Sequence, residues 1–130
     1  MILTTSALMA LWRNGEEASA LHGAIMRSPT RLISAATVVE AAMVLLGERK
    51  GGSDLELDAL LRELEVTIVP FTEDHAHRAR EAARTYGRGR HAAGLTLGDC
   101  FAYALAGGAG EPILCVGDQF AHTDVERVAY

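Results

Sequence analysis

The sequence predicts an α/β fold in which a mostly parallel sheet of four to five short strands is covered by helices on both faces. The segments RLIS (31–34), VTIVPF (66–71) and EPILCVG (111–117) carry continuous apolar runs, which are typical of strands buried on both faces. Helically spaced stretches separate them, and such alternation builds parallel sheets. The chain has 130 residues, 49% apolar and 5% aromatic, so we expect one domain over residues 1–130 with a core of small and aliphatic side chains.

In the first half, the expected helices begin at serines, which are good N-caps. Ser6 precedes ALMALW, Ser34 precedes AATVVEAAMVLL, and Ser53 precedes a segment with leucines at helical spacing. In chain order we expect a strand at 1–3, a helix from Ser6, a helix over about 16–27, a strand at 31–34, a helix from Ser34 to near 51–52, and a helix from Ser53.

In the second half, Thr72 and Thr96 are the expected caps, with Asp99 as an alternative start for the later helix. A Gly-rich loop, GRGRHAAGL, separates the two helices. In chain order we expect a strand at 66–71, a helix from Thr72 to about Tyr86, a helix that ends at 107–108, a strand at 111–117, and a last strand at 125–129.

Composition restricts the class of protein. The net charge of −5 argues against a general nucleic-acid coat, but five of the twelve Lys and Arg residues lie between Arg78 and Arg90. This basic segment is either a solvated helix face or a phosphate-binding patch. No apolar stretch reaches the roughly 18 residues of a membrane span, and no signal peptide is apparent. Cys100 and Cys115 lie in apolar segments, so we expect buried thiols and a cytoplasmic protein.

Two acidic residues lie in unusually apolar surroundings. Glu40 is the only ionisable residue between Ala35 and Leu46, and Asp99 is the only Asp, Glu, Lys or Arg between Arg90 and Glu111. Glu40 could lie on an exposed stripe of its helix, and Asp99 could complete a capping box. Alternatively, both could converge with Asp118, which follows a strand, and clustered carboxylates of this kind suit Mg²⁺ or Mn²⁺.

Four stretches together resemble the PIN-domain ribonucleases and, within them, the VapC-type toxins of bacterial toxin–antitoxin pairs. They are TTSAL near the start, SAATVVEAAMVL around Glu40, YGRGRHAAGLTLGDCFAYALA, and ILCVGDQFAHTDV. The resemblance covers essentially the full length. It implies a PIN-like three-layer fold and an endoribonuclease in which Mg²⁺ or Mn²⁺ activates water to cleave RNA phosphodiesters. By this resemblance Glu40, Asp99 and Asp118 are catalytic residues, and Glu40 and Asp99 are metal ligands.

The chain departs from the family pattern at the first strand. Thr4 stands where the resemblance implies an Asp that binds the metal, and Gln119 stands where the family often has another Asp. Asp124 is a further candidate for the fourth acid, although we favour a structural role for it. The loss of an acid at position 4 predicts a weakened or inactive nuclease. The alternative function is therefore a catalytically dead PIN module that binds its antitoxin or RNA without cleaving; a small α/β binding protein unrelated to nucleases is a third reading.

The resemblance also implies partners. A cognate antitoxin would block the acidic site, and the toxin would form a homodimer or a toxin–antitoxin hetero-oligomer, without membrane contact. Residues 35–46, Leu11 and Trp12 are candidates for such contacts, and core packing is an equal alternative for Trp12. Arg88 and Arg90 are the candidates for binding RNA phosphates.

Overall fold

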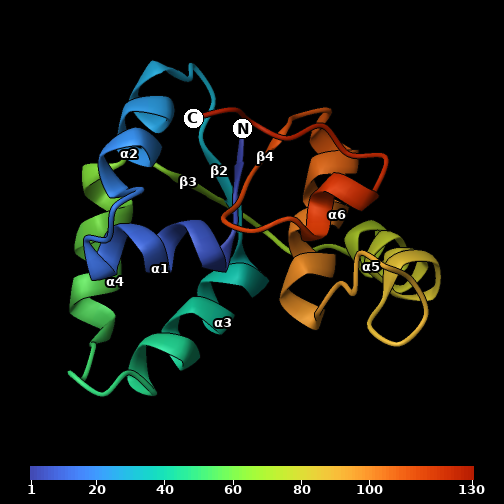
Figure 1. Cartoon of the computed structure of the whole chain (residues 1–130), viewed down its shortest axis with the longest axis horizontal. Coiled ribbons are helices and arrows are strands. Elements are labelled where there is room, and N and C mark those ends of the chain that lie inside the picture. Colours follow the sequence, from blue (N-terminus) through green and yellow to red (C-terminus); the bar gives the residue numbers. More distant parts are fainter.

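The computed structural model describes all 130 residues and contains a four-stranded, entirely parallel sheet in the order β3-β2-β1-β4 (Figure 1). The strands are β1 (Ile2–Leu3), β2 (Leu32–Ser34), β3 (Thr67–Val69) and β4 (Ile113–Leu114). Ile2 in the central strand pairs with Leu32 on one side and with Ile113 on the other. The predicted α/β fold with four short parallel strands is confirmed.

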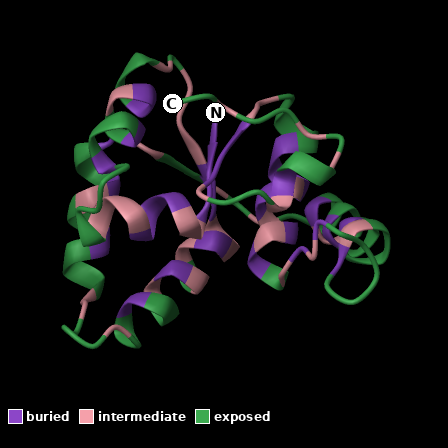
Figure 2. Ribbon diagram, in the orientation of Figure 1, coloured by how far each residue is buried: buried purple, intermediate pink, exposed green.

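The sheet separates two apolar clusters, because successive side chains along a strand point to opposite faces. Leu3, Ile33 and Leu114 lie in the first cluster, whereas Ile2 and Ile113 lie in the second. The first cluster also receives the buried faces of α1 (Thr5–Arg13), α2 (Ala18–Arg27), α3 (Ala35–Leu46) and α4 (Asp54–Glu63). The second receives those of α5 (Glu73–Tyr86) and α6 (Leu97–Ala109). Figure 2 shows the buried residues along β1, β2 and β4 and on the inner helix faces. The edge strand β3 is mostly exposed, so the expectation that residues 66–71 form a strand buried on both faces is wrong.

Most of the predicted caps are confirmed. Ser34, Ser53, Thr72 and Thr96 are the N-caps of α3, α4, α5 and α6, and each side chain accepts a hydrogen bond from the first turn of its helix. The first helix was placed wrongly, because Thr4 rather than Ser6 caps α1. The Ser6 hydroxyl instead accepts a hydrogen bond from the Val116 backbone at 3.1 Å.

Two helix ends and one strand differ from the prediction. Helix α3 stops at Leu46, where Gly47 caps it, and does not reach 51–52. Helix α6 continues through Gly107 and Gly108 to Ala109 and ends at Gly110, whose φ of 66° suits glycine. The predicted strand at 125–129 is wrong: only an isolated bridge joins Arg127 to Ile113, and a 3₁₀ helix, η1 (Gln119–His122), precedes it.

Leu11 and Trp12 are not free surface residues. Both are partly buried against the first cluster, and Trp12 Nε1 donates a hydrogen bond to Glu56 Oε1 on α4 at 3.4 Å. Trp12 thus has a packing role, since its indole joins α1 to α4, and its contact with a partner stays a prediction. None of the helices is long and apolar enough to cross a membrane.

Candidate functional site

The carboxyl ends of β1 and β4 are tied together at Thr4. Its side chain is buried, with 3% of the residue exposed. Thr4 Oγ1 donates to the Leu114 carbonyl oxygen at 2.9 Å, accepts from the Ala7 backbone at 3.3 Å, and lies 3.0 Å from Ser6 Oγ. The hydroxyl is therefore engaged by the fold at the position where the family resemblance implies a metal ligand.

Glu40 reaches from α3 to the first turn of α6. Its Oε2 accepts a hydrogen bond from Thr5 Oγ1 at 2.7 Å, and its Oε1 makes no hydrogen bond within the protein. The carboxylate fills the space that a Cβ on Gly98 would occupy. Gly98 directly precedes Asp99, so the Glu40 carboxylate lies against the first turn of the helix that carries Asp99, where the helix dipole favours negative charge.

Asp99 completes the capping box of α6, as its structural interpretation predicted. Oδ2 accepts from both the backbone N–H and the hydroxyl of Thr96 at 2.9 Å, whereas Oδ1 makes no hydrogen bond within the protein. The box fixes the orientation of the carboxylate and leaves one oxygen free. Neither Asp99 nor Glu40 forms an ion pair with a basic side chain.

Asp118 lies just past β4 and is mostly solvated, with its Oδ1 3.6 Å from Arg127 Nη1. Burial raises the pKa of the nearby Cys115 thiol to about 11, and the charges of Asp99 and Asp118 add to the rise while Arg127 opposes it. Both acids thus lie within electrostatic reach of Cys115. The structure brings Asp118 to the edge of the site and not into contact with Glu40.

Asp124 has a different partner. Its Oδ1 accepts a hydrogen bond from Tyr103 Oη at 2.6 Å, one helical turn along α6 from Asp99. Burial, followed by this bond, raises the pKa of the Tyr103 phenol well above its usual range. This contact supports the structural role that we favoured for Asp124. Gln119 folds back over Gly117, whose φ is 106°.

The donor set suits a divalent cation held by few protein ligands. No group of three or more His, Cys, Asp or Glu side chains is arranged to hold a metal ion. Mg²⁺, however, usually keeps several waters and binds through one or two carboxylates. Glu40 and Asp99 meet this requirement, because each has one oxygen without a protein partner and no basic side chain neutralises either. The Thr4 hydroxyl does not, since its hydrogen bonds already engage it.

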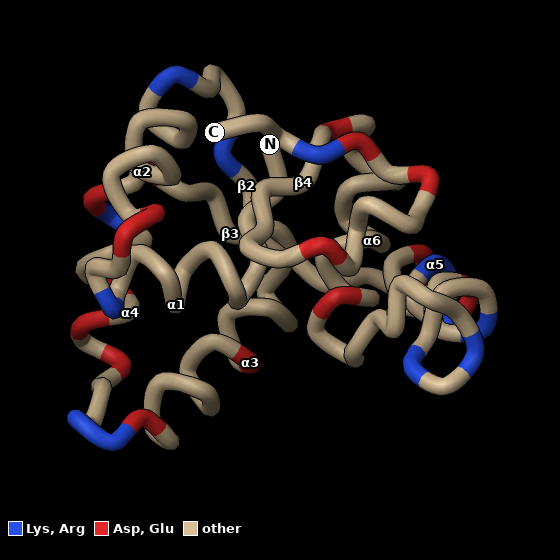
Figure 3. Tube along the Cα trace, viewed as in Figure 1, with Lys and Arg blue, Asp and Glu red and all other residues tan.

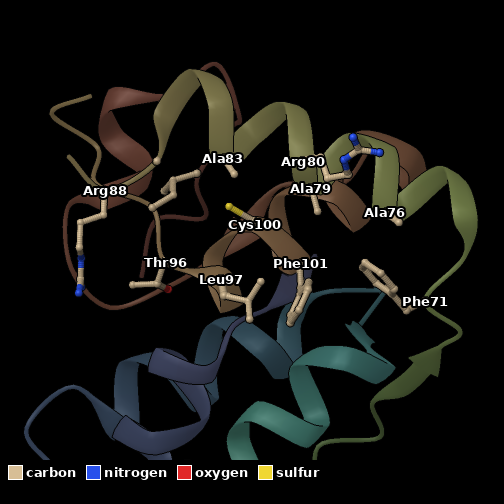
Figure 4. Close-up of a pocket in the computed structure, with 12 residues that line it drawn as sticks. Phe71, Ala76, Ala79, Arg80, Ala83, Arg88, Thr96, Leu97, Cys100 and Phe101 are labelled. Atoms are coloured by element: carbon tan, nitrogen blue, oxygen red, sulfur yellow. The ribbon is translucent and has the colours of Figure 1, made fainter. Parts of the chain in front are cut away.

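A mainly apolar groove adjoins this site. It has a volume of about 610 Å³ between α5 and α6, with Thr96 and Leu97 at its edge and two basic residues, Arg80 and Arg88, in its lining. Figure 4 shows Arg80 and Arg88 near opposite ends of the groove, with Cys100 between the helices. Figure 3 shows the concentration of basic residues on α5 and the loop after it.

Four of the five arginines in this basic segment lack a carboxylate partner. Arg78 pairs with Asp74 at 2.7 Å, and Arg80, Arg84, Arg88 and Arg90 form no ion pair. Those four cations are exposed and can attract phosphates, and two of them, Arg80 and Arg88, line the groove that Thr96 also lines.

Sequence reasoning missed two residues that shape the site. Thr5 donates to Glu40, and Gly98 leaves room for its carboxylate. In the sequence, Gly98 is recognisable only as a small residue immediately before Asp99, and Thr5 only as the second threonine of TTSAL. Neither residue can be linked to Glu40 until the positions of α1, α3 and α6 are known.

Comparisons with known proteins identify the family. The model of the PIN domain family matches residues 1–126. The chain is 41% identical over 129 residues to ribonuclease VapC30 of Mycobacterium tuberculosis, covering 99% of this chain and 98% of the relative. It is 42% identical over 128 residues to ribonuclease VapC of Mycolicibacterium smegmatis, covering 98% and 99%.

Two solved structures share the fold. M. tuberculosis VapC20, a toxin that cleaves the sarcin–ricin loop, superposes with a TM-score of 0.78 at 15% identity, covering 98% of this chain and 97% of the other. A toxin–antitoxin complex from Klebsiella pneumoniae gives 0.66 at 21% identity, with coverage of 95% and 92%. The full-length identity to the curated relatives and the family match lead to one conclusion: this chain belongs to the PIN domain family and, within it, to the VapC ribonucleases.

Proposed function

We propose that this chain is the toxin of a toxin–antitoxin pair and an Mg²⁺- or Mn²⁺-dependent endoribonuclease. The observation that carries the proposal is that the Glu40 carboxylate lies against Gly98 in the first turn of α6, the turn that also carries Asp99, and that neither acid has a basic partner. Isolated carboxylates in such surroundings are costly unless a cation or hydrogen bonds hold them. The ribonuclease names of the relatives with 41% and 42% identity support the same reaction.

In this proposal Glu40 and Asp99 hold the cation, and Asp118 contributes from the edge of the site. A divalent cation bound there would lower the pKa of a water molecule and supply the nucleophile for attack on an RNA phosphodiester. Asp99 is oriented for this role by its capping bonds to Thr96. Arg88 and Arg90 hold flanking phosphates and so place the scissile bond over the carboxylates.

We further propose that Thr4 attenuates this activity. An acid at the end of β1 would add a charged ligand, whereas the Thr4 hydroxyl is neutral and donates to Leu114. Loss of a direct ligand should reduce activity by more than the roughly 10–100-fold typical of residues that only support the ligands. The catalytically dead module is the limiting case of this attenuation and rests on the same observation.

The test is RNA cleavage with Mg²⁺ or Mn²⁺, comparing this chain with Asp99→Asn, with Thr4→Asp, and with Thr4→Asp plus Asp99→Asn. Cleavage by Thr4→Asp alone would assign the site and identify the chain as a disabled nuclease. Cleavage by the chain as it stands, lost on Asp99→Asn, would show that the remaining acids suffice. If no variant cleaves any RNA offered, the nuclease proposal fails and antitoxin binding becomes the activity to measure.

The partners of this proposal are a cognate antitoxin and a second copy of the chain. Val39, Met43 and Leu46 on α3 are 61%, 69% and 65% exposed, and large exposed apolar patches mark interaction sites. A homodimer through α3 predicts that Met43→Glu dissociates the protein to monomers in sedimentation experiments. If the native chain is instead monomeric, we propose that the exposed apolar face of α3 binds the antitoxin.

The remaining expectations belong to the same proposal. Residues 1–130 would act as one PIN domain, and one sheet between two apolar clusters supports this. Both cysteines are buried free thiols, which suits a reducing compartment such as the cytoplasm.

A further inference from the structure

The Glu40 carboxylate is held from one side by a hydroxyl donor. Thr5 is the first residue of α1, and its Oγ1 lies 2.7 Å from Glu40 Oε2 across 35 residues of sequence. Both side chains are partly buried, so the hydrogen bond is shielded from full competition with water. A hydrogen bond to a charged acceptor is shorter and stronger than one between neutral groups.

The other side of the carboxylate is bounded by Gly98. Any side chain at this position would collide with the Glu40 carboxylate. The backbone of Gly98 does not itself need glycine, because its φ is not positive. Glycine in a helix costs up to about 1 kcal/mol relative to alanine, so the local conformation argues for alanine and only the carboxylate explains glycine.

Without these two contacts the Glu40 side chain would have little reason to stay at the site. Its three side-chain torsions are free to rotate toward solvent, and no basic residue draws it inward. The hydroxyl donor of Thr5 on one side and the missing side chain of Gly98 on the other together keep the Glu40 carboxylate at the first turn of α6.

We propose that Thr5 is a positioning residue for the nuclease, and that Thr5 and Gly98 together fix the Glu40 carboxylate at the first turn of α6, which also carries Asp99, before any cation binds. The proposal rests on the proposed function for the role of Glu40. It adds a residue that would set metal affinity without touching the metal, by holding the ligand in place.

The test measures Mn²⁺ binding by electron paramagnetic resonance for the full chain and for Thr5→Val, Thr5→Ser, Glu40→Gln and the double variant Thr5→Val/Glu40→Gln. We expect Thr5→Val to weaken Mn²⁺ binding by about 10-fold or more, as removal of a residue that supports a ligand does, and Thr5→Ser to restore it. In the Glu40→Gln background, Thr5→Val should add nothing. Thr85→Val, at an exposed site on α5, is the matched control and should bind Mn²⁺ like the unchanged chain.

A second measurement needs no metal. Thermal unfolding of the unchanged chain, Thr5→Val, Glu40→Ala and Thr5→Val/Glu40→Ala gives the coupling between Thr5 and Glu40, because alanine, unlike glutamine, removes the hydrogen-bond acceptor. We expect Thr5→Val to lower Tm by about 2–5 °C only when Glu40 is present. Additive effects on Tm would overturn the positioning role. Unchanged Mn²⁺ binding in Thr5→Val, with loss in Glu40→Gln, would also overturn it while the proposed function stands. Unchanged Mn²⁺ binding in Glu40→Gln would instead reject the proposed metal site.

Discussion

Thr4 Oγ1 donates a hydrogen bond to the Leu114 carbonyl oxygen at 2.9 Å, and this contact joins the end of β1 to the end of β4. An ionised aspartate has no proton to donate. Position 4 can therefore either tie the two strands through a hydroxyl or contribute a charge to the site. This chain has the hydroxyl at position 4, which we expect to raise the stability of the metal-free protein and to lower its nuclease activity.

Thr4→Asp should destabilise the metal-free protein. The variant keeps an N-cap for α1 but loses the bond to Leu114 and places a charge in a buried position, at a cost of about 1–3 kcal/mol. Denaturant unfolding in the presence of a chelator measures this cost, and Thr4→Ser, which keeps the donor, is the control. Adding Mn²⁺ should raise the stability of Thr4→Asp more than that of the unchanged chain. Greater stability of Thr4→Asp in the chelator would contradict the role assigned to the hydroxyl.

Asp99→Asn and Asp99→Ala should separate the two roles of Asp99. Asparagine can still accept the hydrogen bonds from Thr96, so we expect little change in stability but a loss of metal binding and of any cleavage. Alanine removes the Asp99 half of the capping box, while Thr96 still caps the helix, and should cost about 1 kcal/mol more in unfolding free energy. The comparison requires unfolding curves and Mn²⁺ titrations on both variants. Equal Mn²⁺ binding in all three proteins would remove Asp99 from the site.

Gly98→Ala should displace the Glu40 carboxylate, because the new methyl group takes its place. The carboxylate is the end of a flexible side chain, so the protein should fold while Mn²⁺ binding and cleavage fall by at least about 10-fold. Gly107→Ala on the same helix is the control. Its Cβ would meet only Arg78 Nη1 at 3.5 Å, so it should be neutral or stabilising by up to about 1 kcal/mol. If both substitutions leave Mn²⁺ binding unchanged, Glu40 does not need the space at Gly98.

Substitution of both Arg88 and Arg90 by alanine should weaken RNA binding and its dependence on salt. Each phosphate contact to a single strand contributes about 0.7 to the slope of log K against log salt, so two lost contacts should reduce it by about 1.4. Filter binding at several salt concentrations measures this slope. Alanine at Arg49 and Lys50, exposed in the loop after α3, makes the same change in net charge away from the site. Equal slopes in both double variants would show that the basic segment does not contact RNA.

The two buried thiols should make stability fall at high pH. Burial raises the pKa of Cys100 and of Cys115 to about 11, above the unfolded value of about 8.5. The folded state therefore favours the protonated thiols, and this contribution is complete below about pH 8.5 and is lost as the pH rises through the folded values. Tm measured from pH 8 to 10.5 should decline less in Cys100→Ala/Cys115→Ala than in the unchanged chain. Reaction with a thiol reagent at pH 8 should be fast only after unfolding.

The sequence by itself determined the type and order of most elements. Continuous apolar strands between helices can be buried only in a covered parallel sheet, and local capping chemistry placed the starts of α3, α4, α5 and α6 at Ser34, Ser53, Thr72 and Thr96. The sequence alone did not predict the N-cap of α1, because both Thr4 and Ser6 are suitable capping residues. The cap depends on the neighbouring strand β4 and the residues after it, since the Leu114 carbonyl and the Val116 backbone N–H bond to the hydroxyls of Thr4 and Ser6.

The acids that form the candidate site were recognisable because Glu40 and Asp99 stand alone in apolar segments. The contact of the Glu40 carboxylate with Gly98, the hydrogen bond from Thr5 and the hydrogen bond between Tyr103 and Asp124 were decided by tertiary structure. The reason is physical. The composition of a segment determines the cost of burying a charge such as that of Glu40. The residues that contact the Glu40 carboxylate, Thr5 and Gly98, lie 35 and 58 positions away in the sequence. Only the packing of α1, α3 and α6 brings them within hydrogen-bonding or van der Waals distance.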